Sequence, residues 1–248
     1  MRGVILAGGS GSRLYPLTRI TNKHLLPVYD KPMIYYAVEA FVSAGIERIL
    51  IVTGGNHAGD FLPLLGNGEA FGLKHIDYTY QEHAGGIAQA LGLARHWSDG
   101  DAVCVMLGDN IFEHSIGGAV RRFAEGGSRG ARLLLAEVDD PSAYGVAVIE
   151  EGRIVRIEEK PTRPRSRYAV TGCYLYDAHV FEFAERLTPS KRGELEITDV
   201  NNAYIESGRV EFDHVTGYWA DCGESFGSYL RAANVVAERG ANKIEKER

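Results

Sequence analysis

Basic residues are outnumbered in this 248-residue sequence, which has 27 lysines and arginines against 33 aspartates and glutamates and a formal net charge of −6. Proteins that bind nucleic acid or an anionic membrane over a broad surface normally carry the opposite sign. The charge balance therefore argues against both as main partners. It remains compatible with a local basic pocket for a phosphorylated small molecule.

Long apolar runs and cysteines are also scarce. The longest runs, such as residues 102–107, have the length of a strand and fall far short of the ~20 residues that cross a membrane. The N-terminal apolar stretch is too short for a signal peptide. Cys104, Cys173 and Cys222 are odd in number and show no CxxC spacing. We interpret them as reduced thiols and expect the protein in the cytoplasm.

What the sequence does contain is an alternation of strand-like and helix-like segments, which predicts an α/β protein with a mostly parallel sheet. Strands are expected at 4–7, 48–52, 78–80, 102–107, 133–138, 146–149, 154–157, 169–176, 210–212 and 218–220. Helices are expected at 33–44, 87–95, 180–187, 197–207 and about 225–238. No linker or repeat interrupts the pattern, so we expect one domain over residues 1–248.

A glycine-rich segment, GGSGSRLYPLTRITNKHLLPVYDKP, runs from Gly8 to Pro32 after the first strand. Glycine-rich turns in this position commonly bind phosphate through backbone N–H groups. The segment lacks the lysine of a P-loop. Leu14 stands where a dinucleotide fingerprint has its third glycine, and the second strand does not end in an acid, so a nicotinamide cofactor is disfavoured. The eight histidines show neither HxH nor HExxH spacing, which argues against zinc.

The segment does fit the pattern G-G-x-G-x-R-L followed by a lysine and a proline, and with it the chain resembles the sugar-nucleotide pyrophosphorylases, most closely the glucose-1-phosphate thymidylyltransferases. The resemblance continues through IVTGGNHAGDF, YQEHAGGIAQAL, VMLGDNIFE, PSAYGVAVIE, EEKPTRPRS, GELEITDVNNAYI and YWADCGE. It implies the Rossmann-like three-layer α/β/α nucleotidyltransferase fold with a mixed sheet. It also implies Mg²⁺-assisted transfer of a deoxythymidylyl group from dTTP to glucose 1-phosphate, with release of pyrophosphate.

The chemistry explains why an arginine closes the loop. The attacking sugar phosphate is already anionic, so the protein must hold two polyanions together and stabilise charge rather than supply a base. A guanidinium can bridge phosphate oxygens, which a lysine point charge does less well. The resemblance gives Arg13 and Lys23 the catalytic roles. It assigns the nucleotide to Leu6, Gly8, Gly9, Gly11, Ser12, Arg13, Gln81, Gly86 and Asp109, with Ser12 replacing the usual threonine.

Two carboxylates, Asp109 and Asp221, follow strands that lie far apart in the sequence. Strand ends at a switch point open into one crevice, and two hard oxygens there suit Mg²⁺. Alone, either residue could simply be a turn or capping aspartate. Gln81 offers a donor and an acceptor that complement O4 and N3–H of thymine or uracil. A flipped amide would fit cytosine, so Gln81 alone does not select the base.

The resemblance divides the chain into a nucleotide-binding half, about residues 1–130, and a sugar-phosphate-binding half, about 131–240. It assigns the sugar phosphate to Tyr144, Gly145, Glu159, Lys160 and, as a lesser candidate, Val170. Tyr174 is another lesser candidate, since strand aromatics are more often core. Trp219 could lie near the metal, although packing is its expected role.

Alternatives remain open at this point. One keeps the chemistry with UTP, CTP or another hexose 1-phosphate. Another is a non-catalytic subunit that binds nucleotide sugars, which should have lost an arginine or a metal carboxylate. The resemblance also implies a homo-oligomer. Longer members continue past the final helix with a segment that helps form a regulatory nucleotide site, so we expect the chain ending at Arg248 to lack that site.

Overall fold

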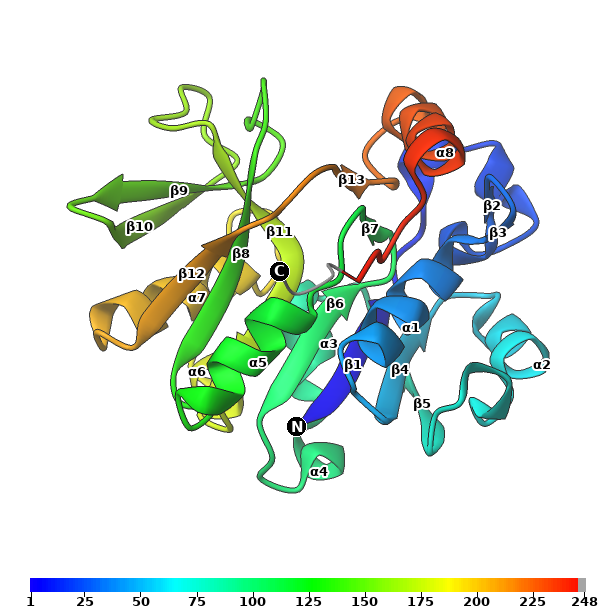
Figure 1. Ribbon diagram of the computed structural model, residues 1–248, viewed down its shortest axis with the longest axis horizontal. Helices are drawn as coiled ribbons and strands as arrows, with labels where there is room; N and C mark the ends of the chain where they lie inside the picture. Colours follow the sequence, from blue (N-terminus) through cyan, green and yellow to red (C-terminus); the bar gives the residue numbers. More distant parts are fainter. Residues whose placement is uncertain (245–248) are drawn as a thin grey trace.

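A computed structural model describes residues 1–244, and its central element is a nine-stranded sheet with helices on both faces (Figure 1). The strands run in the order β10-β9-β11-β6-β1-β4-β5, with β8 beside β11 and β12 beside β8. They are β1 (Arg2–Ala7), β4 (Arg48–Gly54), β5 (His75–Gln81), β6 (Val103–Leu107), β8 (Ala131–Glu137), β9 (Gly145–Glu150), β10 (Arg153–Glu159), β11 (Tyr168–Tyr176) and β12 (Val210–His214).

The sheet is mixed, as expected from the sequence. β1, β4, β5 and β6 are mutually parallel, and β12 is parallel to β8. β11 runs antiparallel to β6, β8 and β9, and β9 and β10 form the predicted hairpin. The parallel part therefore brings the carboxyl ends of β1, β4, β5 and β6 to one edge, where a ligand site is commonly found.

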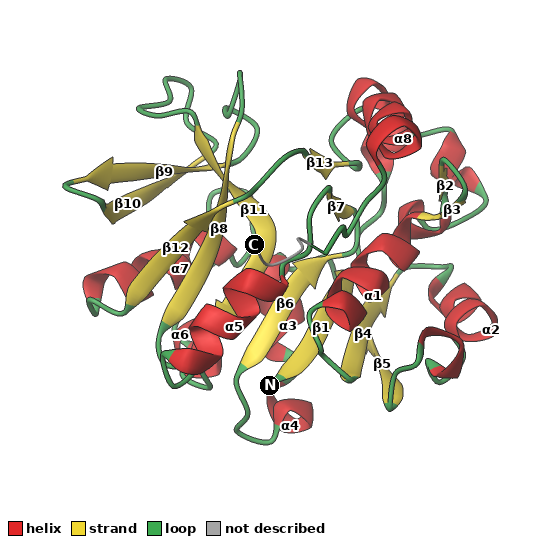
Figure 2. Ribbon diagram, in the orientation of Figure 1, coloured by secondary structure: helices red, strands yellow, loops and turns green. Residues whose placement is uncertain are grey.

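Alternation along the strands explains the two helix layers. In β1, Ile5 and Ala7 belong to one buried cluster while Val4 and Leu6 belong to another, because successive side chains point to opposite faces. The first face is covered by α1 (Met33–Ser43), α2 (Phe61–Leu65) and α5 (Gly117–Glu125), and the second by α3 (Ile87–Gly92), α6 (Val180–Glu185) and α7 (Ile197–Glu206) (Figure 2). The architecture is the expected three-layer α/β/α sandwich.

A smaller unit lies beside the edge where the parallel strands end. β7 (Asn110–Phe112) pairs antiparallel with β13 (Trp219–Asp221), and α8 (Phe226–Arg239) packs over them through a separate buried cluster. The chain before α1 adds the two-residue strands β2 (Pro27–Val28) and β3 (Lys31–Pro32). Within this unit the sequence predicted α8 and a strand near β13.

Several elements differ from the sequence prediction. The helix expected over 87–95 ends at Gly92, and a separate short helix, α4 (Arg95–Ser98), follows it. α5 was not predicted because it begins with two glycines, which disfavour a helix intrinsically. β7 was not among the expected strands. No helix within residues 1–244 has the length and apolar character needed to span a bilayer.

Candidate functional site

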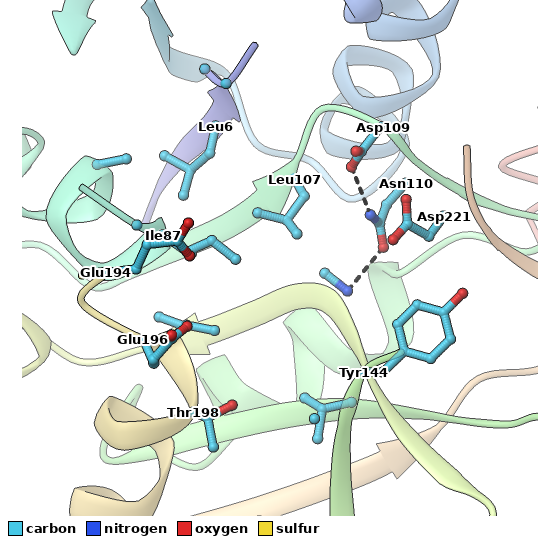
Figure 3. A pocket seen from close by; sticks show the side chains of 18 of the residues that line it. Leu6, Ile87, Leu107, Asp109, Asn110, Tyr144, Glu194, Glu196, Thr198 and Asp221 are labelled. Atoms are coloured by element: carbon cyan, nitrogen blue, oxygen red, sulfur yellow. Dashed lines mark hydrogen bonds between the residues drawn. The ribbon is translucent and has the colours of Figure 1, made fainter. Parts of the chain in front are cut away.

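A cavity of about 300 Å³ opens at the carboxyl ends of β1 and β6, beside β5 and the β9–β10 hairpin (Figure 3). Most of the residues predicted from the sequence line it, namely Leu6, Gly8, Gly9, Arg13, Lys23, Gln81, Gly86, Asp109, Tyr144, Gly145, Glu159, Lys160, Val170 and Asp221. Gly11 and Ser12 do not line it. They lie in the same loop, at the turn that leads to Arg13.

The glycine loop turns sharply between β1 and Arg13. Gly9 and Gly11 adopt φ values of +96° and +63°, a region that favours glycine. A Cβ on Gly11 would also lie 2.7 Å from Cγ2 of Thr18, so position 11 has no room for a side chain. Leu14 is fully buried and anchors the loop, which leaves the Arg13 guanidinium half exposed at the cavity.

Asn22 and His24 fix the backbone on either side of Lys23. The Asn22 amide donates to the carbonyl of Ala7 at the end of β1 (3.3 Å), and its oxygen accepts from the backbone N–H of His24 (3.0 Å). Asn22 Oδ1 also lies 2.7 Å from His24 Nδ1. Burial lowers the pKa of His24 to about 3, so the imidazole is neutral and donates in this contact. These bonds direct the Lys23 side chain into the cavity.

Lys23 and Asp109 form a close ion pair, with Nζ 2.5 Å from Oδ2. Burial opposes the charge on both groups, yet the pairing holds the pKa of Lys23 above its ordinary value and that of Asp109 well below its usual range. Both groups are therefore charged at neutral pH. The pair keeps an ammonium and a carboxylate in the cavity at the end of β6.

Asp221 is brought to Asp109 by the β7–β13 ladder, in which Asp221 lies opposite Asn110. The backbone N–H of Gly223 donates to Asp221 Oδ1 at 2.9 Å. Burial and the charge of Asp109 raise the pKa of Asp221 to about 7. The two predicted carboxylates are thus close enough to repel each other, a repulsion that a bound cation would relieve.

Asn110 supports this pair and was not predicted as a site residue. Its amide donates to Asp109 Oδ1 (3.1 Å), and its oxygen accepts from the Trp219 indole N–H (2.6 Å) and the Gly172 backbone N–H (2.9 Å). Figure 3 shows Asn110 between the two aspartates. Trp219 is buried, as expected of a packing residue, and it lies two residues before Asp221, the strand partner of Asn110.

The donor set fits a small hard cation such as Mg²⁺. The carboxylates of Asp109 and Asp221 with one lysine leave negative charge that a divalent ion would compensate, and carboxylate oxygens are its preferred protein ligands. Among residues 1–244 no group of three or more histidine, cysteine, aspartate or glutamate side chains is arranged to hold a metal. Asp109 and Asp221 would therefore supply two ligands, and the others would come from bound molecules and water.

Gln81 and Gly86 lie on the side of the cavity formed by β5 and the start of α3. Gln81 is 7% exposed, and its amide nitrogen contacts the side chain of Gln89 and the carbonyl of Gly86. Gly86 has φ of +99°, and a Cβ there would lie 2.5 Å from the carbonyl oxygen of Leu195. Glycine is required at position 86 because the chain before α7 crosses directly over it.

Most of the predicted sugar-phosphate residues lie on the opposite side, at the start of β9 and the end of β10, and Val170 lies in β11. Glu159 Oε2 accepts a hydrogen bond from the Thr198 hydroxyl, and Lys160 follows with its backbone N–H bonded to the carbonyl of Tyr144 (3.0 Å). The Tyr144 ring packs edge-on against Trp219, with centroids 5.1 Å apart. This side of the cavity therefore offers hydroxyl acceptors and one ammonium.

Three further acidic or polar residues line the cavity and were not predicted from the sequence, namely Glu194, Glu196 and Thr198. Glu194 and Glu196 lie in the segment that leads into α7, and Thr198 lies in its first turn (Figure 3). Arg192 Nη2 lies 2.8 Å from Glu196 Oε2 and 3.4 Å from Glu159 Oε1, so it neutralises part of this acidic wall. All three residues belong to the block GELEITD, which is part of the resemblance to the family but was given no role. That block is the sequence signal that could have identified them.

Comparison with known proteins adds three findings. The family model described as nucleotidyl transferase matches residues 2–239. A glucose-1-phosphate thymidylyltransferase of Actinoplanes sp. is 46% identical over 243 residues, covering 94% of this chain and 78% of the relative. The Mycobacterium tuberculosis protein of the same name is 44% identical, covering 95% and 82%.

Two solved structures share the fold. A Bacillus anthracis crystal structure, assigned as a glucose-1-phosphate thymidylyltransferase and solved with sucrose, has a TM-score of 0.90 and 50% identity, covering 95% of this chain and 94% of its own. A UDP-glucose pyrophosphorylase complexed with UDP-glucose has a TM-score of 0.81 and 26% identity, covering 96% and 98%.

Proposed function

Because this chain belongs to the nucleotidyl transferase family, we propose that it transfers a deoxythymidylyl group from dTTP to glucose 1-phosphate and releases pyrophosphate. The observation that carries the proposal is the placement of two cations, Arg13 and Lys23, and two carboxylates, the buried Asp109 and the half-buried Asp221, in one cavity. One side of that cavity holds Gln81, and the other holds the hydroxyl-binding groups around Glu159.

The reaction is a single in-line displacement. A phosphate oxygen of glucose 1-phosphate attacks the α-phosphorus of dTTP, a new P–O bond forms, and the bond to the pyrophosphate oxygen breaks with its electron pair leaving on pyrophosphate. Both the nucleophile and the leaving group are anionic, so the chain needs to orient them and reduce their repulsion. We assign Arg13 to the β- and γ-phosphates and Lys23 to the phosphates that meet at the reacting centre.

Asp109 and Asp221 are the proposed Mg²⁺ ligands, and the bound ion would neutralise charge on the phosphate oxygens. The chain's own contribution is the fixed position of these carboxylates. Asp109 is held by Lys23 and Asn110, and Asp221 by the backbone N–H of Gly223. The leaving oxygens can then be stabilised without rearrangement of the protein.

The nucleotide and sugar are proposed to occupy opposite sides of the cavity. The backbone of Gly8 and Gly9 and the amide of Gln81 face the triphosphate and base. Tyr144, Gly145, Glu159 and Val170 face the hexose, with Lys160 on its phosphate. Thymidylyl transfer is preferred over uridylyl transfer because the thymidylyltransferases are 44–50% identical to this chain, whereas the UDP-glucose pyrophosphorylase is 26% identical.

The remaining sequence expectations form part of the same proposal. The three cysteines are free and buried, which suits the reducing cytoplasm where dTTP is available. A homo-oligomer and one domain with a nucleotide half and a sugar half are proposed by analogy with the family. A non-catalytic binding subunit is less favoured, because Arg13, Lys23, Asp109 and Asp221 are all present.

The test is release of pyrophosphate by the purified chain with Mg²⁺ and glucose 1-phosphate, run in parallel with dTTP, UTP, CTP, ATP and GTP. Strong preference for dTTP supports the proposal. Turnover with UTP alone would identify a uridylyltransferase, and no turnover with any of the five would contradict transfer to glucose 1-phosphate.

A further inference from the structure

The side-chain amide of Gln81 faces two different environments at its two ends. Its nitrogen lies 2.5 Å from Gln89 Oε1 and 3.4 Å from the carbonyl oxygen of Gly86. Its oxygen points toward Gly8, where an added Cβ would lie 2.5 Å from it. A side chain at position 8 would overlap this oxygen, so glycine there leaves the Gln81 oxygen accessible.

This orientation follows from the chemistry of the neighbours. A backbone carbonyl only accepts hydrogen bonds, so the group facing Gly86 O must be the NH₂ of Gln81. The flipped amide would place two oxygens against each other at that point. Gln89 adds a second and shorter acceptor on the same side, which makes the NH₂ end fully engaged within the protein.

Gln89 is itself held in place. It is the third residue of α3, and its Cγ lies 3.1 Å from the position that a Cβ on Gly85 would occupy. The loop that contains Gly85 is itself held by a hydrogen bond, because the backbone N–H of Leu195 donates to the Gly85 carbonyl at 2.8 Å. The side-chain oxygen of Gln89 is therefore held in a fixed position, where it accepts a hydrogen bond from Gln81.

We propose that Gln89 is a positioning residue for base selection, because it binds the NH₂ of Gln81 and leaves the Gln81 carbonyl oxygen as the group offered to the base. Among residues 1–244 that oxygen has no hydrogen-bond partner. The proposal rests on the nucleotidyl transfer proposed above, in which Gln81 faces the base. Gln81 would thus act as an acceptor alone, rather than as the donor–acceptor pair expected from the sequence.

An acceptor at this place discriminates between pyrimidines. Thymine and uracil carry a hydrogen on N3 and can donate to the Gln81 oxygen. Cytosine has a lone pair on N3, so its N3 would face the same oxygen without a proton between them. With the Gln81 oxygen placed opposite N3 of the base, as we propose, fixing the amide selects thymine and uracil against cytosine.

The test compares kcat/KM for dTTP and CTP in the wild-type chain, in Gln89→Met and in Gln89→Glu. Methionine keeps the length of the side chain and removes the oxygen acceptor, whereas glutamate keeps the acceptor. The ratio of dTTP to CTP activity should fall about tenfold in Gln89→Met, the effect of about one hydrogen bond. It should stay within about twofold of wild type in Gln89→Glu.

A purely structural role of Gln89 would give a different result, because loose packing would lower both activities and leave their ratio unchanged. An unchanged ratio in Gln89→Met, or an equal fall in Gln89→Glu, would overturn the proposal. In a Gln81→Met background the Gln89→Met change should no longer affect the ratio. A wild-type chain without dTTP activity would contradict the proposed function instead, so the two failures are distinguishable.

Discussion

Arg13 Nη1 lies 2.7 Å from Glu224 Oε2, so the guanidinium assigned to the triphosphate already has an anionic partner in the segment after β13. The side chains are 54% and 31% exposed, and no other residue within 1–244 forms an ion pair with either of them. A triphosphate that binds Arg13 must therefore compete with Glu224. The pair holds the arginine at the mouth of the site and weakens its affinity for the nucleotide.

Replacing this carboxylate should strengthen nucleotide binding. In Glu224→Gln we expect the KM for dTTP to fall by up to about fivefold, since an exposed ion pair contributes about 0.2–1 kcal/mol. Steady-state kinetics at saturating glucose 1-phosphate measure this directly. Glu206→Gln removes an exposed charge at the end of α7 and should leave KM unchanged. A higher KM in Glu224→Gln would mean that Glu224 assists binding instead of competing.

Arg13 itself should be needed for turnover and not for folding. Its side chain is half exposed, so Arg13→Ala should unfold at the wild-type temperature. Its kcat should fall ~10³-fold or more, as for other arginines that stabilise phosphoryl transfer. Arg19→Ala, which removes an exposed arginine six residues later, is the matched control. Wild-type turnover in Arg13→Ala would show that the assigned role is wrong.

The two carboxylates should differ in their effect on stability. Burial and Asp109 raise the pKa of Asp221 to about 7, so its charge is unfavourable in the folded protein. Asp221→Asn should therefore keep Tm without Mg²⁺ within about 2 °C of wild type or raise it. Asp109→Asn leaves the Lys23 ammonium without its partner and should cost about 3 kcal/mol of unfolding free energy.

Both variants should lose the rise in Tm that Mg²⁺ with dTTP gives the wild-type protein, because each removes one proposed ligand. Thermal melts with and without Mg²⁺ and dTTP measure stability and binding together. Equal destabilisation by the two substitutions would contradict the different environments described for Asp109 and Asp221.

Neighbouring glutamates at the end of β10 offer a matched pair for the sugar side. Glu159 lines the cavity and accepts from Thr198, whereas Glu158 points to the other face of the strand and pairs with Arg165 at 3.5 Å. Glu159→Gln should raise the KM for glucose 1-phosphate about tenfold, the effect of about one charged hydrogen bond, with the KM for dTTP unchanged. Glu158→Gln should change neither. A shift in the dTTP constant alone would place Glu159 at the nucleotide instead.

The sequence predicted the large elements because their patterns are strong. The run over 102–107 is apolar throughout, and Val103 to Met106 are fully buried as its length and composition require. β7 was missed for the opposite reason. Its three residues are too few to show a period, and they form a strand because Trp219–Asp221, more than a hundred residues later, pair with them.

The residues of the candidate site also differ in whether the sequence predicted them. Arg13, Lys23 and Asp109 lie in short motifs whose spacing is characteristic, so their shared cavity was expected. Glu194 and Glu196 precede a helix and have no pattern of their own. Their position is set by tertiary backbone bonds, in which Leu195 donates to the Gly85 carbonyl and accepts from the N–H of Ala88. Such contacts leave no trace in local sequence.

The β7–β13 ladder also determines when the site can form. Asn110 and Asp221 pair across a separation of about a hundred residues, and closing so long a loop is slow compared with local helix or hairpin formation. A nascent chain that has folded its first half would hold Asp109 and Lys23 but no second carboxylate. Affinity for Mg²⁺ should therefore emerge late in refolding, which makes bound metal a reporter of the completed fold.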